Sequence, residues 1–444
     1  MKAKNEIFNK LYLLYFISLP LVFSKSIIDP VLVPRQIHLG FFCIVTLAFM
    51  YFTKGENNEF TFKKEFKYLP IALLIFGGIN LISISQANVL SEAYFVVSRI
   101  STTILFFFIT IILLIRNQLL IDTLFKGVFC FATISLLIAG YQIIYNDDLN
   151  LISSTMANKN LLSSALFLCL PFLMIYKNEW KNYKYVQYSL ITLLLIVLFY
   201  IRTRAVIIPL IIGGAIYLAN KIYHVVKLKN RTRLSFFVVV GILCLLFSLF
   251  YINHNTSLGS FTDSNTFNTR VKLWHNTKYI IADNTLLGVG PGNWKFKFAN
   301  YGIGNLLKEA SDGRMIYQQP HNDFLEFFAD SGLLAFLGYI ALYVITAFYL
   351  MQLYKSANLN EDKEKYFIFL IALLGFAFIS FFDFPMERVE HQVLFFTLLA
   401  VVLYYFSSLK DSQNLLNINF KTRYLFVLIF AGVFTAAVSI YIGT

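Results

Sequence analysis

The sequence predicts an all-α, polytopic membrane protein with about 12–13 transmembrane helices and one long outer loop that contains short helices. Composition is the first observation: the 444 residues are 58% hydrophobic and 14% charged, whereas soluble proteins carry about 25% charged residues. The second is that the apolar runs are long and continuous, unlike the short alternating segments of a membrane β-barrel. The third is that one long polar segment, 253–324, interrupts them.

Each predicted transmembrane helix is an apolar run of about 16 to 25 residues, which suits a hydrocarbon layer about 30 Å thick. The predicted spans are 8–24, 37–52, 69–85, 95–115, 119–145, 161–176, 186–201, 205–220, 234–252, 331–353, 366–384, 392–407 and 424–443.

These spans predict one integrated domain in three parts: an N-terminal bundle of about nine helices over 1–252, a loop over 253–324, and three or four C-terminal helices over 325–444. Lys and Arg are about three times as numerous in the connectors on one side as in the short connectors on the other. The positive-inside rule therefore predicts a cytoplasmic N-terminus and an outward-facing loop. Because no small-residue cleavage site follows the N-terminal apolar run, we interpret that run as the first span.

The net charge of +13 suggests a nucleic-acid partner at first. The cations lie in the connectors, however, as orientation in a membrane requires, so we expect a lipid bilayer and no nucleic acid as the partner. The four cysteines show no metal-binding spacing and are expected to be buried free thiols; they are Cys43, Cys130, Cys169 and Cys244.

Ionisable residues at the rim of a span are costly and are candidates for function. On the predicted outer side they are Lys159, Arg202, Arg204, Asp383, Glu387, Arg388, Glu390 and His391. The two arginines around Thr203 occupy a very short turn, and arginine binds phosphate through a two-pronged fork, which favours a phosphate or pyrophosphate ligand. Asp122 and Lys126 are spaced as an i, i+4 pair and are interpreted as structural.

Within the loop, residues 269–283 predict an amphipathic helix that carries Arg270, Trp274 and Lys278 on one stripe. Trp274 is also compatible with a simple membrane-interface anchor. The segment Gly288–Asn293 is too rich in glycine and proline for a helix, and we expect a turn whose backbone amides approach a ligand closely.

His321 follows Pro320 and precedes Asn322 and Asp323 at the predicted outer rim. A neutral imidazole can take a proton from a hydroxyl at physiological pH, so His321 is a candidate general base. Metal binding with Asp323 and Glu326 is the alternative, although their spacing matches no metal motif known to us.

Four ordered segments resemble the O-antigen ligase and O-antigen polymerase superfamily of membrane glycosyltransferases. They are Asn158-Lys159-Asn160-Leu161 with Pro171; Thr203-Arg204-Ala205; Arg270 to Trp274 followed by Asp283 to Asn293; and His321-Asn322-Asp323-Phe324-Leu325 with Gly332-Leu333-Leu334. The sequence departs mildly from the family pattern at Thr203, Thr285 and Asp330.

The resemblance implies transfer of a glycan from an undecaprenyl-pyrophosphate carrier at the periplasmic face of the bacterial inner membrane, without a cofactor or a metal and with inversion. His321 would then be the catalytic base, with Arg204 and Arg270 on the pyrophosphate. The remaining candidate substrate-binding residues are Arg202, Lys159, Asn160, Trp274, Gly290, Asn293 and Asn322.

Three reactions of this class stay open. Ligation of the glycan to lipid A–core is favoured, because polymerases often have two large outer loops and protein transferases often continue past the last span. A protein O-oligosaccharyltransferase and a polysaccharide polymerase are the alternatives. Outside the class, a transporter of lipid-linked sugars would show internal repeats, and none is evident.

Overall fold

The predicted all-α polytopic membrane fold is confirmed by a computed structural model that describes residues 2–24, 26–27, 29–52, 59–146, 148–176, 183–226, 264–301, 316–409 and 415–419. Within these ranges, nine helices are long and apolar enough to cross a membrane. The predicted spans 234–252 and 424–443, and Cys244, lie outside the described residues. The other three cysteines are free, as expected, but only Cys43 and Cys169 are buried, whereas Cys130 is half-buried.

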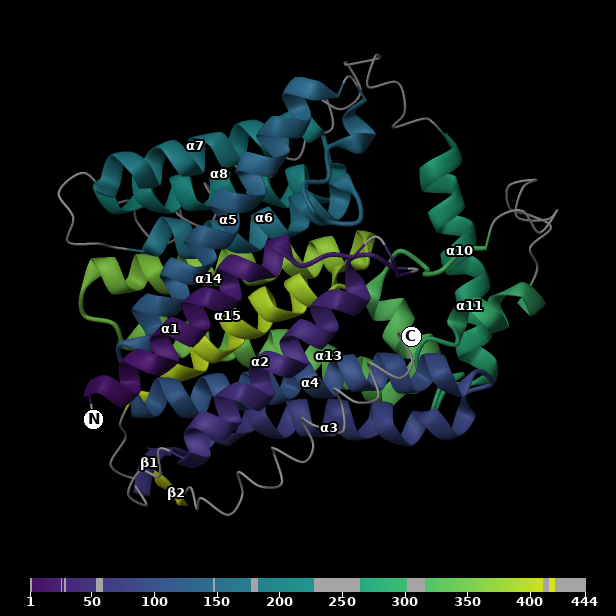
Figure 1. The fold of residues 1–444 in the computed structure, drawn as a ribbon, viewed down its shortest axis with the longest axis horizontal. Coiled ribbons are helices and arrows are strands. Elements are labelled where there is room, and N and C mark those ends of the chain that lie inside the picture. The colour runs from purple at the N-terminus through teal and green to yellow at the C-terminus, as the bar shows by residue number, and fades with distance from the viewer. Residues whose placement is uncertain are drawn as a thin grey trace.

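The long helices run side by side in one bundle, and Figure 1 shows α10 and α11 at one end of it. The α-helices are α1 (Lys2–Ser18), α2 (Leu32–Phe52), α3 (Tyr68–Ser83), α4 (Leu90–Arg116), α5 (Leu120–Tyr145), α6 (Lys159–Ile175), α7 (Tyr183–Ile201), α8 (Arg204–Val226), α10 (Ser264–Asp283), α11 (Trp294–Lys297), α13 (Asp323–Ser356), α14 (Asn360–Phe382) and α15 (Val389–Ser407). Short 3₁₀ helices are η1 (Leu19–Leu21), η2 (Lys64–Lys67), η3 (Ile84–Gln86), η4 (Leu149–Leu151), η6 (Phe298–Tyr301) and η8 (Pro385–Glu387).

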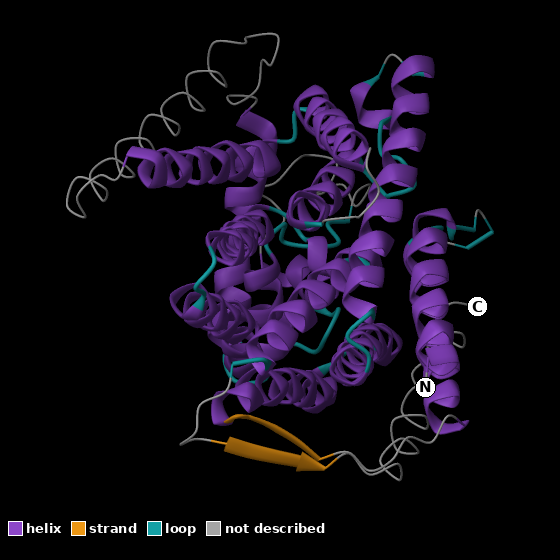
Figure 2. Ribbon diagram, turned by 90° about the vertical axis from the view of Figure 1, so that its left-hand side faces the viewer, coloured by secondary structure: helices purple, strands orange, loops and turns teal. Residues whose placement is uncertain are grey.

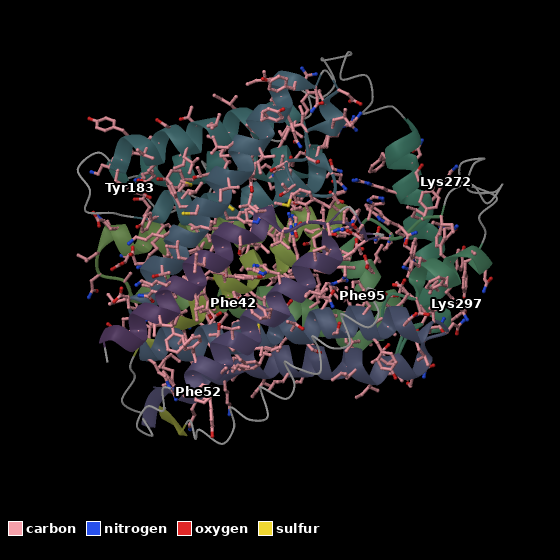
Figure 3. The ribbon with its side chains drawn as sticks, in the orientation of Figure 1. Phe42, Phe52, Phe95, Tyr183, Lys272 and Lys297 are labelled. Atoms are coloured by element: carbon pink, nitrogen blue, oxygen red, sulfur yellow. The ribbon has the colours of Figure 1, made fainter. Side chains whose placement is uncertain are left out.

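We call the end of the bundle that carries α10, α11 and the start of α13 the loop end. Lys272 and Lys297 lie there, whereas Phe52 and Tyr183 lie at the opposite end (Figure 3). The core between these ends is apolar and aromatic. Helices α4 and α15 are its most enclosed members, since more than four fifths of the apolar window of each is buried.

Two local predictions need correction. The first helix was expected at 8–24 but ends at Ser18, because Pro20 in η1 disfavours helical backbone before it. A small antiparallel sheet was not predicted: β1 (Glu59–Lys63) pairs with β2 (Leu415–Asn419), with Thr61 opposite Asn417. Figure 2 shows these two strands apart from the helices. The pairing joins segments that are distant in sequence, so neither segment predicts it alone.

Helix α13 is broken at Gly332, whose φ of 79° and ψ of −175° are not helical. The predicted span 331–353 matches the part after the break, and the first part forms a separate short helix from Asp323. The break frees the backbone amide of Leu333, which donates to Thr285 O at 2.8 Å. A Cβ on Gly332 would lie 2.1 Å from Leu286 O, so only glycine fits between the two segments.

The glycine-rich segment of the loop docks on this break. Val289 N donates to Ala329 O at 2.9 Å, and Gly290 N donates to Asp330 O at 2.8 Å. The Asp330 carboxylate accepts from Gly292 N at 2.7 Å and Trp294 N at 2.8 Å. The loop is therefore fixed to the bundle through the backbone and side chain of Asp330.

We predict that Gly332→Ala lowers the stability of the purified protein by about 2 kcal/mol or more, because alanine is strained at this positive φ and its Cβ meets the loop backbone. Thermal unfolding in detergent or nanodiscs measures the change. Gly140→Ala is the matched control, because a Cβ there has no neighbour within 4 Å. The control is expected to be neutral or slightly stabilising. Equal melting temperatures for the two variants would contradict the role of the break.

Candidate functional site

His321 stands at the junction between the loop and α13. Its φ of 54° lies in the left-handed region, which is uncommon for a residue other than glycine and marks a constrained position. The next residue, Asn322, is fully buried and caps α13 by accepting a hydrogen bond from Leu325 N at 3.0 Å. The helix cap and the turn before it therefore fix the direction of the His321 side chain.

The closest charged partner of His321 is Asp383, at the end of α14. The His321 Nδ1 atom lies 3.7 Å from Asp383 Oδ1, and the carboxylate is almost entirely buried. The Phe384 ring packs edge-on against the imidazole at 4.8 Å. Sequence reasoning placed Asp383 among the outer ionisable residues but gave it no role, because the residues are far apart in the chain. A carboxylate directly after an aromatic helix end was the available signal.

Helix α10 carries Arg270 and Trp274 to this junction. The predicted helix is confirmed, although it begins earlier, at Ser264. Trp274 Nε1 donates to Pro320 O at 2.9 Å, and its ring packs against Phe381 and Phe382. Arg270 lies one turn earlier on the same face of α10. Its Nε is buried and has no hydrogen-bond partner among the described residues, which is unusual for a buried donor.

The Arg202–Arg204 turn is joined to the start of α6. The hydroxyl groups of Thr203 and Ser163 lie 2.9 Å apart. Arg202 is exposed with a φ of 59°, and Arg204 begins α8. Lys159 and Asn160 occupy the first turn of α6. The structure thus brings these four predicted residues to one corner.

A second contact joins α6 to α15, which follows the Asp383 turn. Ser164 Oγ lies 2.8 Å from His391 Nε2, which also lies 2.9 Å from Leu161 O. In turn, Met386 N donates to the Asp323 carboxylate at 3.3 Å. These contacts link the arginine turn, the Asp383 turn and the start of α13 through neighbouring helix ends. The predicted residues therefore share the loop end of the bundle.

The glycine-rich turn differs from its prediction. We expected its amides to be open to a ligand, but each amide from Gly288 to Trp294 other than Pro291 already donates to a protein acceptor. Gly290 packs against Ala87, and Asn293 accepts from Val89 N at 2.7 Å. The glycines are needed because the backbone passes very close to its neighbours. Gly290 and Asn293 thus hold the loop to the start of α4.

The sequence did not predict the buried ion pair and hydrogen bonds of Arg35 behind the site, which we call the frame. Arg35 is fully buried and lies 3.0 Å from Glu390. Its other donors reach Val22 O at 3.2 Å and Thr155 O at 2.9 Å. The sequence signal that could have revealed this ion pair is an arginine in the first turn of an apolar helix. The predicted structural pair Asp122–Lys126 is confirmed at 2.6 Å.

Fold and site together define a multi-pass membrane protein with a charged site at one end of its helical bundle. Residues 188–340 match the family described as O-antigen ligase. This segment, roughly a third of the chain, contains Arg204, Arg270, His321 and the Asp330 clamp. No curated protein matches the chain. The match supports assignment to the O-antigen ligase and polymerase family and a glycan-transfer type of function.

An ion pair between Asp29 and Arg388, 2.8 Å apart, ties the Asp383 turn to the segment before α2. Partial burial alone would raise the pKa of Asp29. The Arg388 guanidinium and the amides of Leu32 and Val31 outweigh it, so the pKa is lower than usual. A lowered carboxyl pKa stabilises the fold above the unfolded-state pKa, about 3.9, and this contribution disappears as pH falls through the folded-state value.

We therefore predict that Arg388→Met lowers the melting temperature at pH 7, and that its difference from wild type shrinks as pH falls below about 4. Thermal unfolding across pH measures this. Asp29→Asn should produce a similar loss at pH 7, and the double variant should lose less than the two single losses combined. A difference that is independent of pH would show that the ion pair does not hold this turn.

Proposed function

We propose that this protein transfers a glycan from an undecaprenyl-pyrophosphate carrier to an acceptor hydroxyl at the periplasmic face of the inner membrane, and that its acceptor is lipid A–core. The observation that carries the proposal is the placement of His321 beside a buried carboxylate, at an end of the bundle that also receives Arg204 and Arg270. The family match over these three residues supports the type of reaction.

In this proposal the two arginines bind the pyrophosphate. Guanidinium groups are permanently charged and grip phosphate oxygens in pairs. The unpartnered, buried Nε of Arg270 supports this role, since a bound phosphate would supply its missing acceptor. Lys159, Asn160 and Arg202 lie at the same corner as Arg204 and add further donors for the carrier or its first sugar. Trp274 positions α10, and Asn322 positions His321.

An apolar groove beside α8 can hold the carrier lipid. An apolar groove of about 90 Å³ between α6, α8 and α14 is lined by Leu170, Pro209, Gly213 and Ile371, among others. Pro209 lies little more than one turn from Arg204 on the same helix. An isoprenoid chain in this groove would keep its pyrophosphate near the arginine while its apolar units stay in contact with apolar side chains.

His321 acts as the general base. Nδ1 faces Asp383, so Nε2 is the nitrogen that accepts the proton of the acceptor hydroxyl. The hydroxyl oxygen forms the new bond to the anomeric carbon while the bond from that carbon to the carrier phosphate breaks. The configuration inverts, and the electron pair leaves with the pyrophosphate, where Arg204 and Arg270 stabilise the added charge. Asp383 stabilises the imidazolium that forms.

We predict that His321→Ala, Arg204→Ala and Arg270→Ala each lower the rate of glycan transfer by about 10²-fold or more. The assay uses the purified full chain in nanodiscs with carrier-linked glycan and lipid A–core. His275→Ala and Lys272→Ala are matched controls on the exposed face of α10 and should keep wild-type rates. Full transfer by all three site variants would refute the assignment.

Asp383→Asn should lower kcat by about 10²-fold or more, because an amide leaves the imidazolium without a counter-charge. The KM values for donor and acceptor should change little, since the carboxylate contacts the base and not the substrates. Steady-state kinetics on the folded Asp383→Asn variant measures kcat and both KM values. Unchanged kcat with a raised KM would instead place Asp383 in substrate binding.

Deletion of the gene in its host tests the acceptor. The proposal predicts lipid A–core without glycan, together with accumulated long glycan on the carrier. Chains of a single repeat unit would indicate a polymerase in its place. Unmodified surface proteins with normal lipid A–core glycan would indicate a protein transferase.

A further inference from the structure

A second group of ionisable residues lies behind the His321 junction, inside the bundle. Arg99 of α4, Glu326 of α13 and Glu387 of η8 line one small polar cavity of about 20 Å³. Asp323, two residues from His321, and Asp330 also line it. The space suits about one water molecule or one hydroxyl group.

The charges in this cavity are not paired with one another. Arg99 is 5% exposed, its Nε has no hydrogen-bond partner, and within the described residues no carboxylate lies within 4.0 Å of its guanidinium. Its guanidinium carbon lies 5.7 Å from the centroid of the Phe95 ring. One carboxylate oxygen each of Glu326 and Glu387 is also buried without a hydrogen bond, and that of Glu387 lies 3.8 Å from Arg388.

Arg35 is a buried arginine with a structural role, and its partners can be compared with those of Arg99. Arg35 is as buried as Arg99, but it has a carboxylate at 3.0 Å and donates to the backbone of three separate residues. An unpartnered buried charge costs several kcal/mol, and a ligand that supplies the partner would remove this cost. The contrast supports a binding role for Arg99, and Glu326 and Glu387 line the same cavity.

The mixture of charges selects the ligand. Glu387 repels a phosphate, and Arg99 repels a metal cation. A hydroxyl group both donates to a carboxylate and accepts from a guanidinium, so it satisfies both kinds of residue at once. The amides of Asn80 and Gln392 in the wall are already hydrogen-bonded within the fold. Arg99, Glu326 and Glu387 each keep a buried atom that makes no hydrogen bond.

We propose that this cavity is a subsite for one hydroxyl-bearing arm of a sugar, and that Arg99, Glu326 and Glu387 bind it and determine which sugar is accepted. The inference rests on the proposed glycan transfer and names a contact made by the glycan substrates. The sugar can belong to the donor glycan or to the acceptor, since both carry the same chemistry. His321 immediately precedes the first turn of α13, which carries Glu326, so a sugar anchored here has its reacting atoms next to the base.

The first test measures sugar binding without turnover. Saturation-transfer NMR is recorded on the full chain in nanodiscs with methyl glycosides of glucose, galactose, mannose and N-acetylglucosamine as probes. At least one glycoside should bind wild type, and Arg99→Met and Glu326→Gln should weaken it by about 10-fold or more. Arg116→Met is the matched control, because Arg116 lies at the other end of α4. The control should bind as wild type does.

The second test separates binding from structure. Because Arg99 and Glu326 are unpaired, their uncharged variants should have wild-type or higher melting temperatures, whereas a structural role predicts lower ones. In the transfer assay the same variants should raise KM by about 10-fold. A rise for the carrier-linked glycan assigns the sugar to the donor, and a rise for lipid A–core assigns it to the acceptor.

The outcomes distinguish this inference from the proposed function. Glycan transfer by wild type with no glycoside binding, or equal binding and KM in the variants, overturns the subsite. Lower melting temperatures with unchanged KM also overturn it, because they show a structural role. Glycoside binding that depends on Arg99 in a wild-type protein that transfers no glycan supports the subsite and refutes the proposed function.

Discussion

The site depends on the interlocking of the glycine-rich turn with the break in α13. Gly332 interrupts the helix where the loop backbone crosses it, and Asp330 holds that backbone by its own carbonyl and carboxylate oxygens. Ser83 Oγ donates to the carbonyls of Leu287 and Asp330 and adds α3 to the same junction. His321 immediately precedes the short helix before the break, so the position of the base follows from this packing.

Buried polar groups at the loop end fall into two kinds. Some are paired, such as Arg35 with Glu390, and this pair connects segments that are distant in sequence. Others have a buried atom without a hydrogen-bond partner, such as Nε of Arg270 and Nε of Arg99. Burial without a partner is costly. The Arg35–Glu390 pair is therefore best understood as part of the frame, and Arg270 and Arg99 as the positions where we propose that substrates complete the hydrogen bonding.

The location of the membrane helices was predictable because it depends on local hydropathy, and the predicted α10 depends on local periodicity. Helix ends set by capping or by proline, as at Pro20, were less predictable. Contacts between distant segments were not predictable from one sequence. This class includes the pairing of β1 with β2, the approach of Asp383 to His321, and the Arg35–Glu390 ion pair.

The glycine-rich turn shows why composition alone misled the prediction. Glycines allow close approach of the backbone to a ligand or to another part of the protein, and sequence cannot distinguish the two. Here the close neighbours are Asp330 and Ala87, so the turn binds protein. The same reasoning explains why Arg204 and Arg270 were easier to identify as candidates. A charged side chain at the end of an apolar segment needs a partner, whatever that partner is.

The most direct test of the central claim is a cryo-EM structure of the full chain with bound undecaprenyl pyrophosphate. We expect pyrophosphate density between Arg204 and Arg270 at the loop end, with His321 still beside Asp383 and the glycine-rich turn still hydrogen-bonded to Asp330. Pyrophosphate at the opposite end of the bundle would contradict it. So would release of the turn from Asp330, with its amides bound to the phosphate oxygens.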